Sequence, residues 1–241
     1  METTSNATPL RVLVHGANGR MGQAVMRLAG ERDDLAIVGA VSRKVGQRVV
    51  EGVPQFAANE LSGTPDCDVV VDFSLPEAFD ALLANCIAHG RPLVSGTTGL
   101  SEDQTRSLDA AAATVPVLWA SNFSLGVAVL VELAERAARA LPGWDCDIVE
   151  QHHTRKLDAP SGTALTLGDA AGRGGAQARY ASLRAGDIVG EHTVQFATLG
   201  ERIELVHRAT DRDIFARGAL HAAAWLARQA PGRYRIADAL R

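Results

Sequence analysis

Residues 12–22 read VLVHGANGRMG: a short apolar run and then three glycines, Gly16, Gly19 and Gly22. Asn18 occupies the position of the middle glycine of the usual dinucleotide-binding fingerprint, but the physical requirements are still met. Gly16 permits a tight turn, Gly19 lets backbone approach a pyrophosphate, and Gly22 allows close packing of helix on strand. The helix start then offers unpaired N–H groups to phosphate oxygens. Such glycines also fit an ordinary turn, and their place directly after a first strand favours the dinucleotide interpretation.

Outward from this stretch, the first half of the chain alternates apolar runs with amphipathic ones. The apolar runs are rich in Val and Leu and end in Gly or Ser, as buried strands do; they are LRVLVHG, LAIVGAV, CDVVVDFS, RPLVSG and VPVLWAS. Helices are expected over 21–30, 77–89 and 101–113, the last opening with Ser101 and Gln104 at capping-box spacing. This alternation predicts βαβ units and an α/β domain with a Rossmann-like, doubly wound parallel sheet.

The pattern changes after residue 122. A long helix is expected over 125–141, a strand over 147–152, and a short helix beginning near Ser161. Two alternating runs around Leu199-Gly200-Glu201 predict an antiparallel hairpin, and 213–229 has helical spacing. We interpret 171–178, AGRGGAQA, as a flexible connection. The middle of the chain is therefore a separate α+β domain.

The composition bounds the class of protein. The chain has 241 residues, 46% hydrophobic and 22% charged, as in an ordinary soluble protein, and its net charge of −4 gives no reason to expect nucleic acid or an anionic membrane as partner. Its three cysteines form no CxxC pair, and an odd count is typical of a reducing compartment. The first nine residues lack the pattern of a secretory signal, and no apolar run approaches the ~20 residues of a membrane helix. We expect a cytoplasmic protein.

The end of the second strand bears on which nicotinamide cofactor binds. An acidic residue there would hold the ribose 2′-hydroxyl, but the chain has Ser42, Arg43 and Lys44. The two cations favour NADPH through its 2′-phosphate without excluding NADH, and the alternative is that both are solvated loop charges. Two further loops, 96–98 and 120–124, follow strands at the sheet edge where ligands gather, which favours a nicotinamide-side role over simple turns.

Residues 150–164, EQHHTRKLDAPSGTA, concentrate proton donors and anion binders. Taken singly, each histidine would more often be structural and Lys156 a surface charge. Adjacent histidines on a strand point to opposite faces, and no motif has metal-ligand spacing, so we expect no metal. Ser161 instead caps a helix whose first amides bind carboxylate or phosphate, with Lys156 nearby and a histidine able to donate a proton near neutral pH. The set fits an anionic substrate that accepts a hydride at one atom and a proton at another.

This central motif closely resembles the signature of the dihydrodipicolinate reductase family. The segments GANGRMG, GTTG, SNFSLGV, RAGDIVGEHTVQFA and GERIELVHRATDRDIFARGAL resemble it too, in order from Val12 to about Leu226. The resemblance implies reduction of 4-hydroxy-tetrahydrodipicolinate to tetrahydrodipicolinate by NADH or NADPH, with loss of water, in the diaminopimelate route to lysine. It also implies a dinucleotide-binding domain over 1–123 and 209–241, and a substrate-binding and tetramerisation domain over 124–208 that makes a homotetramer.

The resemblance assigns roles residue by residue. It makes His152 the proton donor or acceptor, Lys156 a second donor, His153 a substrate contact, and Gly162 and Thr163 the cradle of a substrate carboxylate. The expected cofactor contacts, with the loop at the second strand added, are Gly16, Ala17, Asn18, Gly19, Arg20, Met21, Ser42, Arg43, Gly96, Thr97, Thr98, Ala120, Ser121, Asn122 and Phe123.

Two departures from the family pattern matter. Ser42-Arg43 stand where an acidic residue is common, which puts dual cofactor use in question, and the segment of roughly 172–183 is shorter than usual, which bears on subunit contacts. Two other hypotheses remain. An oxidoreductase for another small acid would not turn over the dipicolinate precursor. A non-catalytic dinucleotide sensor would bind cofactor and oxidise none, and has no need of a lysine and histidine beside an anion cradle.

Overall fold

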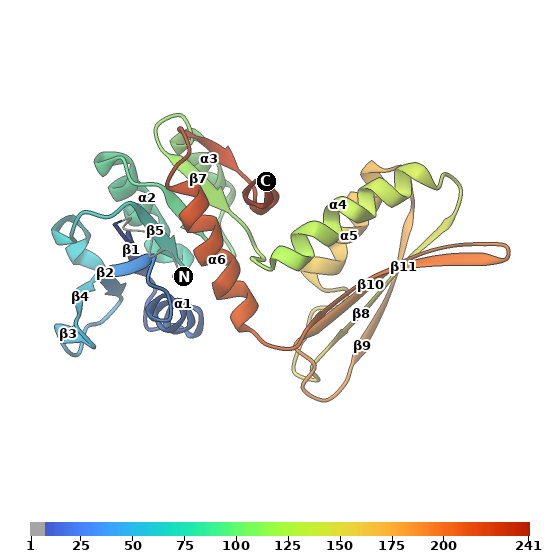
Figure 1. The fold of residues 1–241 in the computed structure, drawn as a ribbon, viewed down its shortest axis with the longest axis horizontal. Helices are drawn as coiled ribbons and strands as arrows, with labels where there is room; N and C mark the ends of the chain where they lie inside the picture. Colours follow the sequence, from blue (N-terminus) through green and yellow to red (C-terminus); the bar gives the residue numbers. More distant parts are fainter. Residues whose placement is uncertain (1–7) are drawn as a thin grey trace, which may run out of the picture. The chain divides into compact units, whose positions relative to one another are not determined.

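The computed structural model describes residues 8–241. The first seven residues, which belong to the stretch where the sequence pattern leads us to expect no secretory signal, lie outside the described residues. The chain forms two units, labelled by their elements in Figure 1. Unit 1 comprises the described residues through Phe123 together with Phe215–Arg241, and unit 2 comprises Ser124–Ile214. The second division lies between Ile214 and Phe215, inside the helix Asp213–Leu226. The assignment of 1–123 with 209–241 to dinucleotide binding, and of 124–208 to substrate binding and tetramerisation, stays a prediction.

Unit 1 is built on an eight-stranded sheet with the order β12-β7-β6-β5-β1-β2-β4-β3. Its strands are parallel except for the short antiparallel pair β3–β4. The bounds are β1 Leu10–His15, β2 Leu35–Ser42, β3 Val49–Val50, β4 Val53–Ala57, β5 Val69–Asp72, β6 Leu93–Ser95, β7 Pro116–Trp119 and β12 Gly232–Tyr234. From β1 the chain first builds outward through β2 and later returns to β5 on the other side, so the topological switch point lies between β1 and β5.

Helices cover both faces of this sheet, since successive strand residues point to opposite sides. Val12 and Val14 of β1 pack with α1 (Arg20–Gly30) and α6 (Asp213–Leu226). Leu13, between them, packs with α2 (Pro76–His89) and α3 (Glu102–Ala111). The predicted doubly wound parallel sheet is confirmed. The sequence missed β3, β4, β12 and the 3-10 turns η1 (Ala58–Gly63) and η2 (Ile236–Leu240), which are too short to show a period.

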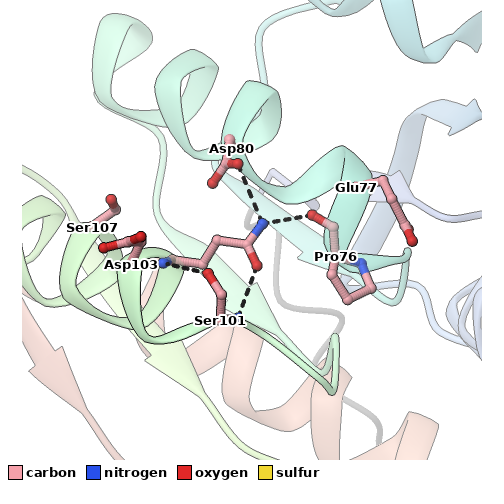
Figure 2. A pocket seen from close by; sticks show the side chains of 7 residues that line it. Pro76, Glu77, Asp80, Ser101, Asp103 and Ser107 are labelled. Carbon is pink, nitrogen blue, oxygen red and sulfur yellow. Dashed lines mark hydrogen bonds between the residues drawn. The ribbon is translucent and has the colours of Figure 1, made fainter.

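The predicted capping box is confirmed at the start of α3. Ser101 Oγ accepts a hydrogen bond from the Gln104 amide at 3.1 Å, and Gln104 Oε1 accepts one from the Ser101 amide at 3.0 Å. The Gln104 Nε2 group also donates to Pro76 O at 2.7 Å and to Asp80 Oδ2 at 3.3 Å, as Figure 2 shows. One side chain therefore closes the start of α3 and ties it to α2. The hollow that these residues line holds none of the expected site residues.

Unit 2 is a four-stranded sheet, in the order β11-β10-β8-β9, with two helices on one face. The strands are β8 Asp145–His152, β9 Ala178–Arg184, β10 Gly190–Thr198 and β11 Glu201–Ala209; the helices are α4 Leu125–Ala140 and α5 Gly162–Arg173. Ile148, Val194 and Phe196 are fully buried beneath Leu130 and Leu167 of the helices. The predicted hairpin is confirmed as the antiparallel pair β10–β11.

The interpretation of 171–178 as a flexible connection is wrong at both ends. Its first three residues complete the last turn of α5, and Ala178 begins β9, which pairs in parallel with β8. Glycine-rich composition concealed this, because the pairing of β9 with β8 is a tertiary contact that composition does not report. Within residues 8–241, no helix combines the length and the apolar character that crossing a membrane requires.

Candidate active site

His152 is the last residue of β8, and the alternation of that strand turns it to the helix-covered face. Its side chain is buried, whereas the neighbouring His153 is partly exposed, which is consistent with the predicted opposite orientation of the two rings. Among the described residues, His152 Nδ1 hydrogen-bonds to Glu150 Oε2, and Nε2 has no hydrogen-bond partner. Burial lowers the pKa of His152, and Glu150 opposes that effect while Lys156 adds to it.

Glu150, two residues before His152, is fully buried and is surrounded by donors. Arg184 of β9 grips both carboxylate oxygens, with Nη1 to Oε2 at 3.0 Å and Nη2 to Oε1 at 2.8 Å. The Ser161 amide also donates to Oε1 at 3.3 Å. Burial opposes the negative charge, but the bonds from Arg184, Ser182 and His152 prevail and lower the pKa of Glu150 to about 2. The group is therefore a carboxylate at neutral pH.

His192 of β10 lies against the other side of His152. The two rings meet edge to face, with centroids 5.1 Å apart and planes at 75°. His192 Nε2 is 3.1 Å from Ser161 Oγ. Burial, followed by the charge of His152, lowers the pKa of His192 to about 4, so this imidazole is neutral at pH 7 and adds no positive charge beside His152.

Lys156 and Asp158 lie on the loop between β8 and α5. Lys156 Nζ is 2.8 Å from Asp158 Oδ1, and the Lys156 side chain is about one quarter exposed. The hydrogen bond from Lys156 lowers the pKa of Asp158. Arg184 Nη2 reaches the Asp158 carbonyl oxygen at 2.5 Å, which fixes this loop to the end of β9.

His153 contacts the guanidinium group of Arg212. Its Nε2 is 3.1 Å from Arg212 Nη2, so a neutral imidazole accepts that hydrogen bond. Among the described residues its buried Nδ1 has no partner. Burial, then the charges of Arg155 and Arg212, lower the pKa of His153. The ring is therefore neutral and surrounded by positive charge.

The start of α5 has the geometry that the sequence predicts. Ser161 is the N-cap, and its Oγ accepts from the Ala164 amide at 3.2 Å. Gly162 is exposed and Thr163 partly so, which places both at the solvent side of the first turn. The first amides of a helix lack intrahelical acceptors and carry partial positive charge, so this turn can hold an anion.

In unit 1 the glycine loop follows β1 directly and leads into α1. Gly16 has φ of +79°, and a Cβ there would lie 2.5 Å from the Phe73 carbonyl oxygen. A Cβ on Gly22 would lie 2.3 Å from the Gly16 carbonyl oxygen. These two positions therefore require glycine for the turn and for close packing. The loop residues Asn18, Gly19 and Arg20 are exposed at the helix start, whereas Ala17 is buried and Met21 partly so.

The second-strand loop meets the glycine loop. Ser42 ends β2, and its Oγ accepts from the Asn18 amide at 3.2 Å, while Asn18 Nδ2 donates to the Lys44 carbonyl oxygen at 3.3 Å. Ser42 is buried, so its hydroxyl serves the loop, and Arg43 and Lys44 are the exposed groups. The structure thus brings the backbone that carries these two cations beside the glycine turn.

A buried carboxylate joins the loops at the switch point. Asp72, the last residue of β5, accepts from the paired His15 Nδ1 at 2.8 Å. It also accepts from Ser95 Oγ at 2.7 Å, from Thr97 Oγ1 at 2.8 Å and from the Ser74 amide at 3.0 Å. Burial opposes ionisation, and the bonds led by His15 nevertheless lower the pKa of Asp72.

The remaining residues that we expect to contact the cofactor differ in how exposed they are to solvent. The side chain of Thr97 turns inward to Asp72 and Phe123 packs edge to face on Phe73, so these two have structural contacts. Thr98 and Ser121 are exposed, while Gly96, Ala120 and Asn122 are partly exposed.

Sequence reasoning missed Glu150, Arg184, His192 and Asp72. Glu150 lies inside the quoted motif, and its spacing of two from His152 on a strand is a signal that both share a face. Arg184 and His192 are opposite β8 only through the register of β9 and β10, which pairs Arg184 with His152 and His192 with Glu150. No local pattern reports that register.

Comparisons with known proteins cover nearly the whole chain. Residues 10–123 match the family model of the dihydrodipicolinate reductase N-terminus, and residues 126–240 match that of its C-terminus. The 4-hydroxy-tetrahydrodipicolinate reductase of Stenotrophomonas maltophilia (strain R551-3) is 70% identical over 237 residues, which are 98% of this chain and 99% of the relative. That of Xanthomonas campestris pv. campestris (strain B100) is 66% identical over 232 residues, covering 96% and 98%.

A solved structure agrees at the level of the fold. The dipicolinate-bound dihydrodipicolinate reductase from Paenisporosarcina sp. TG-14 aligns with a TM-score of 0.82 and 22% identity, over 95% of this chain and 98% of that one. The family models and the identities confirm the resemblance that the sequence motifs predict. The chain belongs to the dihydrodipicolinate reductase family.

Proposed function

We propose that the chain performs the reaction of its family with the residues described above. It is an NAD(P)H-dependent oxidoreductase that reduces 4-hydroxy-tetrahydrodipicolinate to tetrahydrodipicolinate in the diaminopimelate route to lysine. The reaction consumes one hydride and one proton and releases one water. Bound NADH or NADPH supplies the hydride, so the protein must supply the proton, hold the dicarboxylate and bind the cofactor.

The proton comes from His152 in this proposal. The observation that supports it best is the hydrogen-bond arrangement of the ring, with Nδ1 on Glu150 and Nε2 without a partner among the described residues. A ring held in this way can deliver a proton only from Nε2. Lys156, on the adjacent loop, is the second donor, and its bond to Asp158 holds the ammonium in place until substrate arrives.

The start of α5 holds one substrate carboxylate in this proposal. Gly162 and Thr163 offer first-turn amides, and the capping hydroxyl of Ser161 orders that turn. His153 contacts the substrate as a neutral imidazole next to Arg212, in surroundings of positive charge that suit a dianion.

Unit 1 fits a dinucleotide. Its glycine turn has no room for a Cβ at two positions, presents exposed backbone at the start of α1, and lies beside the topological switch point where ligands of such sheets bind. We assign cofactor contacts to the exposed and partly exposed residues of the loops that follow β1, β2, β6 and β7. The side chains of Thr97 and Phe123 shape these loops from inside.

NADPH is the preferred cofactor in our proposal, because Arg43 and Lys44 follow β2 beside the glycine turn and no carboxylate stands there.

We also propose a homotetramer assembled through unit 2, on the strength of family membership. A cytoplasmic location is supported by three cysteines that form no disulfide within residues 8–241.

The direct test is a coupled assay. A synthase generates the unstable substrate in the cuvette, each reduced cofactor is supplied in turn, and the absorbance of the reduced nicotinamide is followed. We expect cofactor oxidation that depends on the synthase product and is faster with NADPH. Cofactor binding without oxidation would indicate a sensor, and oxidation with other small acids alone would indicate a different substrate.

A further inference from the structure

We propose that Glu150 is the positioning residue of this site. Its carboxylate sets the tautomer and orientation of the His152 imidazole and at the same time anchors the cap of α5. The inference deepens the proposed function, because it concerns the imidazole assigned there as proton donor.

The first support is where the carboxylate lies. Glu150 and His152 are two apart on β8 and therefore face the same side of the sheet, where Glu150 is fully buried. A buried carboxylate is costly unless it is fully bonded, and here Arg184, Ser161 and His152 supply the bonds. The fork of Arg184 fixes both oxygens, so the oxygen that faces Nδ1 does not rotate away.

The second support is the tautomer that this contact imposes. An ionised carboxylate only accepts hydrogen bonds, so Nδ1 carries a hydrogen in the neutral ring as well as in the charged one. Nε2 is then the nitrogen that gains and loses the proton. A Cβ at residue 190 would lie 3.0 Å from Nε2, and Gly190 thus leaves space beside that atom.

The groups around His152 determine how its proton affinity responds to Glu150. Three of these groups lie on strands: Glu150 on β8, Arg184 on β9 and His192 on β10. The fourth, Lys156, lies on the loop between β8 and α5. Of these, Glu150 alone favours the imidazolium, while burial, Lys156 and Arg184 disfavour it. Removing the negative charge therefore lowers the pKa of His152 further.

The third support is the link to the anion-binding turn. Glu150 Oε1 accepts from the amide of Ser161, the N-cap of α5, at 3.3 Å. The Glu150 carboxylate thus bonds to the His152 imidazole through Oε2 and to the start of α5 through Oε1. Their relative placement is set by a single buried group.

The test uses the full chain with Glu150→Gln, which keeps the shape and removes the charge. We expect kcat to fall by about 10- to 100-fold, less than for loss of the imidazole itself, with little change in the KM for NADPH. A proton donor must be protonated to act, so kcat declines as pH rises through its pKa. In the variant this decline must move to lower pH. An unchanged kcat and an unchanged pH profile would overturn the proposal.

The tautomer is measured independently of turnover and of any variant. Long-range ¹⁵N–¹H NMR spectra of histidine-labelled wild-type protein, assigned with His152→Gln and recorded over a pH series, are expected to show His152 as the Nδ1–H form wherever the ring is neutral. An Nε2–H form would overturn the proposal even if the enzyme turns over normally. Conversely, a wild-type chain with no turnover but an Nδ1–H ring would contradict the proposed function and leave the positioning intact.

A matched control lies on the same strand. Asp147 of β8 also pairs with an arginine of β9, with its Oδ1 2.7 Å from Arg179 Nε, but on the opposite face and without a histidine. We expect Asp147→Asn to leave kcat, the pH profile and the His152 resonances unchanged. Equal effects of the two variants would mean that any broken β8–β9 ion pair disturbs the site, and would overturn a specific role for Glu150.

Discussion

At the level of single residues, the division of labour between His152 and Lys156 follows from their surroundings. His152 is buried, with one nitrogen committed to Glu150, whereas Lys156 is partly exposed and bonded to Asp158. The histidine is therefore fixed in direction, and the lysine must exchange a partner to reach a substrate. In the proposed mechanism, these two proton donors therefore differ in how freely they can move.

Replacing a proposed proton donor should slow turnover without weakening cofactor binding. We expect His152→Gln to lower kcat by about 10²- to 10⁴-fold, the usual contribution of a positioned acid, and Lys156→Ala to lower it strongly as well. Neither residue lies in unit 1, so NADPH affinity measured by fluorescence titration should stay near normal. Turnover at the wild-type rate in both variants would contradict the assigned roles.

Replacing Arg43 tests whether the chain prefers NADPH to NADH. Arg43 is exposed directly after β2 and beside the glycine turn. We expect Arg43→Ala to raise the KM for NADPH about tenfold, as the loss of one charge-assisted phosphate contact does, and to leave the KM for NADH nearly unchanged. Equal changes for the two cofactors would show that this loop does not bind the 2′-phosphate.

At the level of elements, the loops of the sheet edge are joined by Asp72. Its carboxylate links the ends of β1, β5 and β6 through His15, Ser74, Ser95 and Thr97, and the bonds to His15, Ser95 and Thr97 are buried. The glycine turn follows His15 without an intervening residue. The geometry of these loops is therefore set by a buried side chain.

Neutralising Asp72 should loosen that edge. We expect Asp72→Asn to raise the KM for both cofactors several-fold, because one of the two acceptor oxygens that join the loops becomes an NH2 donor, and to alter kcat less. Steady-state assays at saturating substrate measure this, and circular dichroism checks that the variant is folded. A KM unchanged for both cofactors would restrict Asp72 to a role in stability.

The start of α3 gives a stability test away from the site. Gln104→Ala removes one half of the capping box and the bonds to α2 visible in Figure 2. We expect the free energy of unfolding in urea to fall by ~1 kcal/mol, with kcat unchanged. Ser107→Ala, an exposed change on the same helix, is the control and should alter neither quantity.

At the level of the whole molecule, buried carboxylates make the fold sensitive to acid. The pKa of Glu150 is lowered from its ordinary 4.5 to about 2, and that of Asp72 is also lowered. A group with a lowered folded-state pKa stabilises the protein above its unfolded value, and the stabilisation disappears as pH falls through the folded value.

We therefore expect the free energy of unfolding to decrease as the pH falls from about 4.5 towards 2. Urea titrations at several pH values measure this, and the slope should be smaller in Glu150→Gln, which has no proton to bind there. Identical slopes in wild type and variant would contradict the lowered pKa of Glu150.

The proposed assembly is tested on the same scale. Sedimentation velocity of the wild-type chain should give a species of four times the 25.4 kDa chain mass. A monomer or dimer over the whole accessible concentration range would contradict the homotetramer and leave the family assignment untouched.

The sequence by itself determined the elements with a period or a signature. Runs rich in Val and Leu and ended by Gly or Ser predicted β1, β2 and β5 to β7. The Ser101 and Gln104 pair predicted the start of α3, and Leu199-Gly200 predicted the β10–β11 hairpin. The central motif predicted the family together with His152, Lys156 and the turn of α5. These features are local, because each depends on residues within one or two helical turns or strand lengths.

Tertiary structure alone decided what surrounds those residues. Arg184 reaches Glu150 from 34 positions away, and His192 reaches Ser161 from 31, because the register of β9 and β10 on β8 places them there. His15 and Asp72 meet across 57 positions at the switch point. Strand register is fixed by burial of a whole sheet face, a cooperative property of the folded chain, so local pattern cannot supply these partners or the pKa shifts they cause.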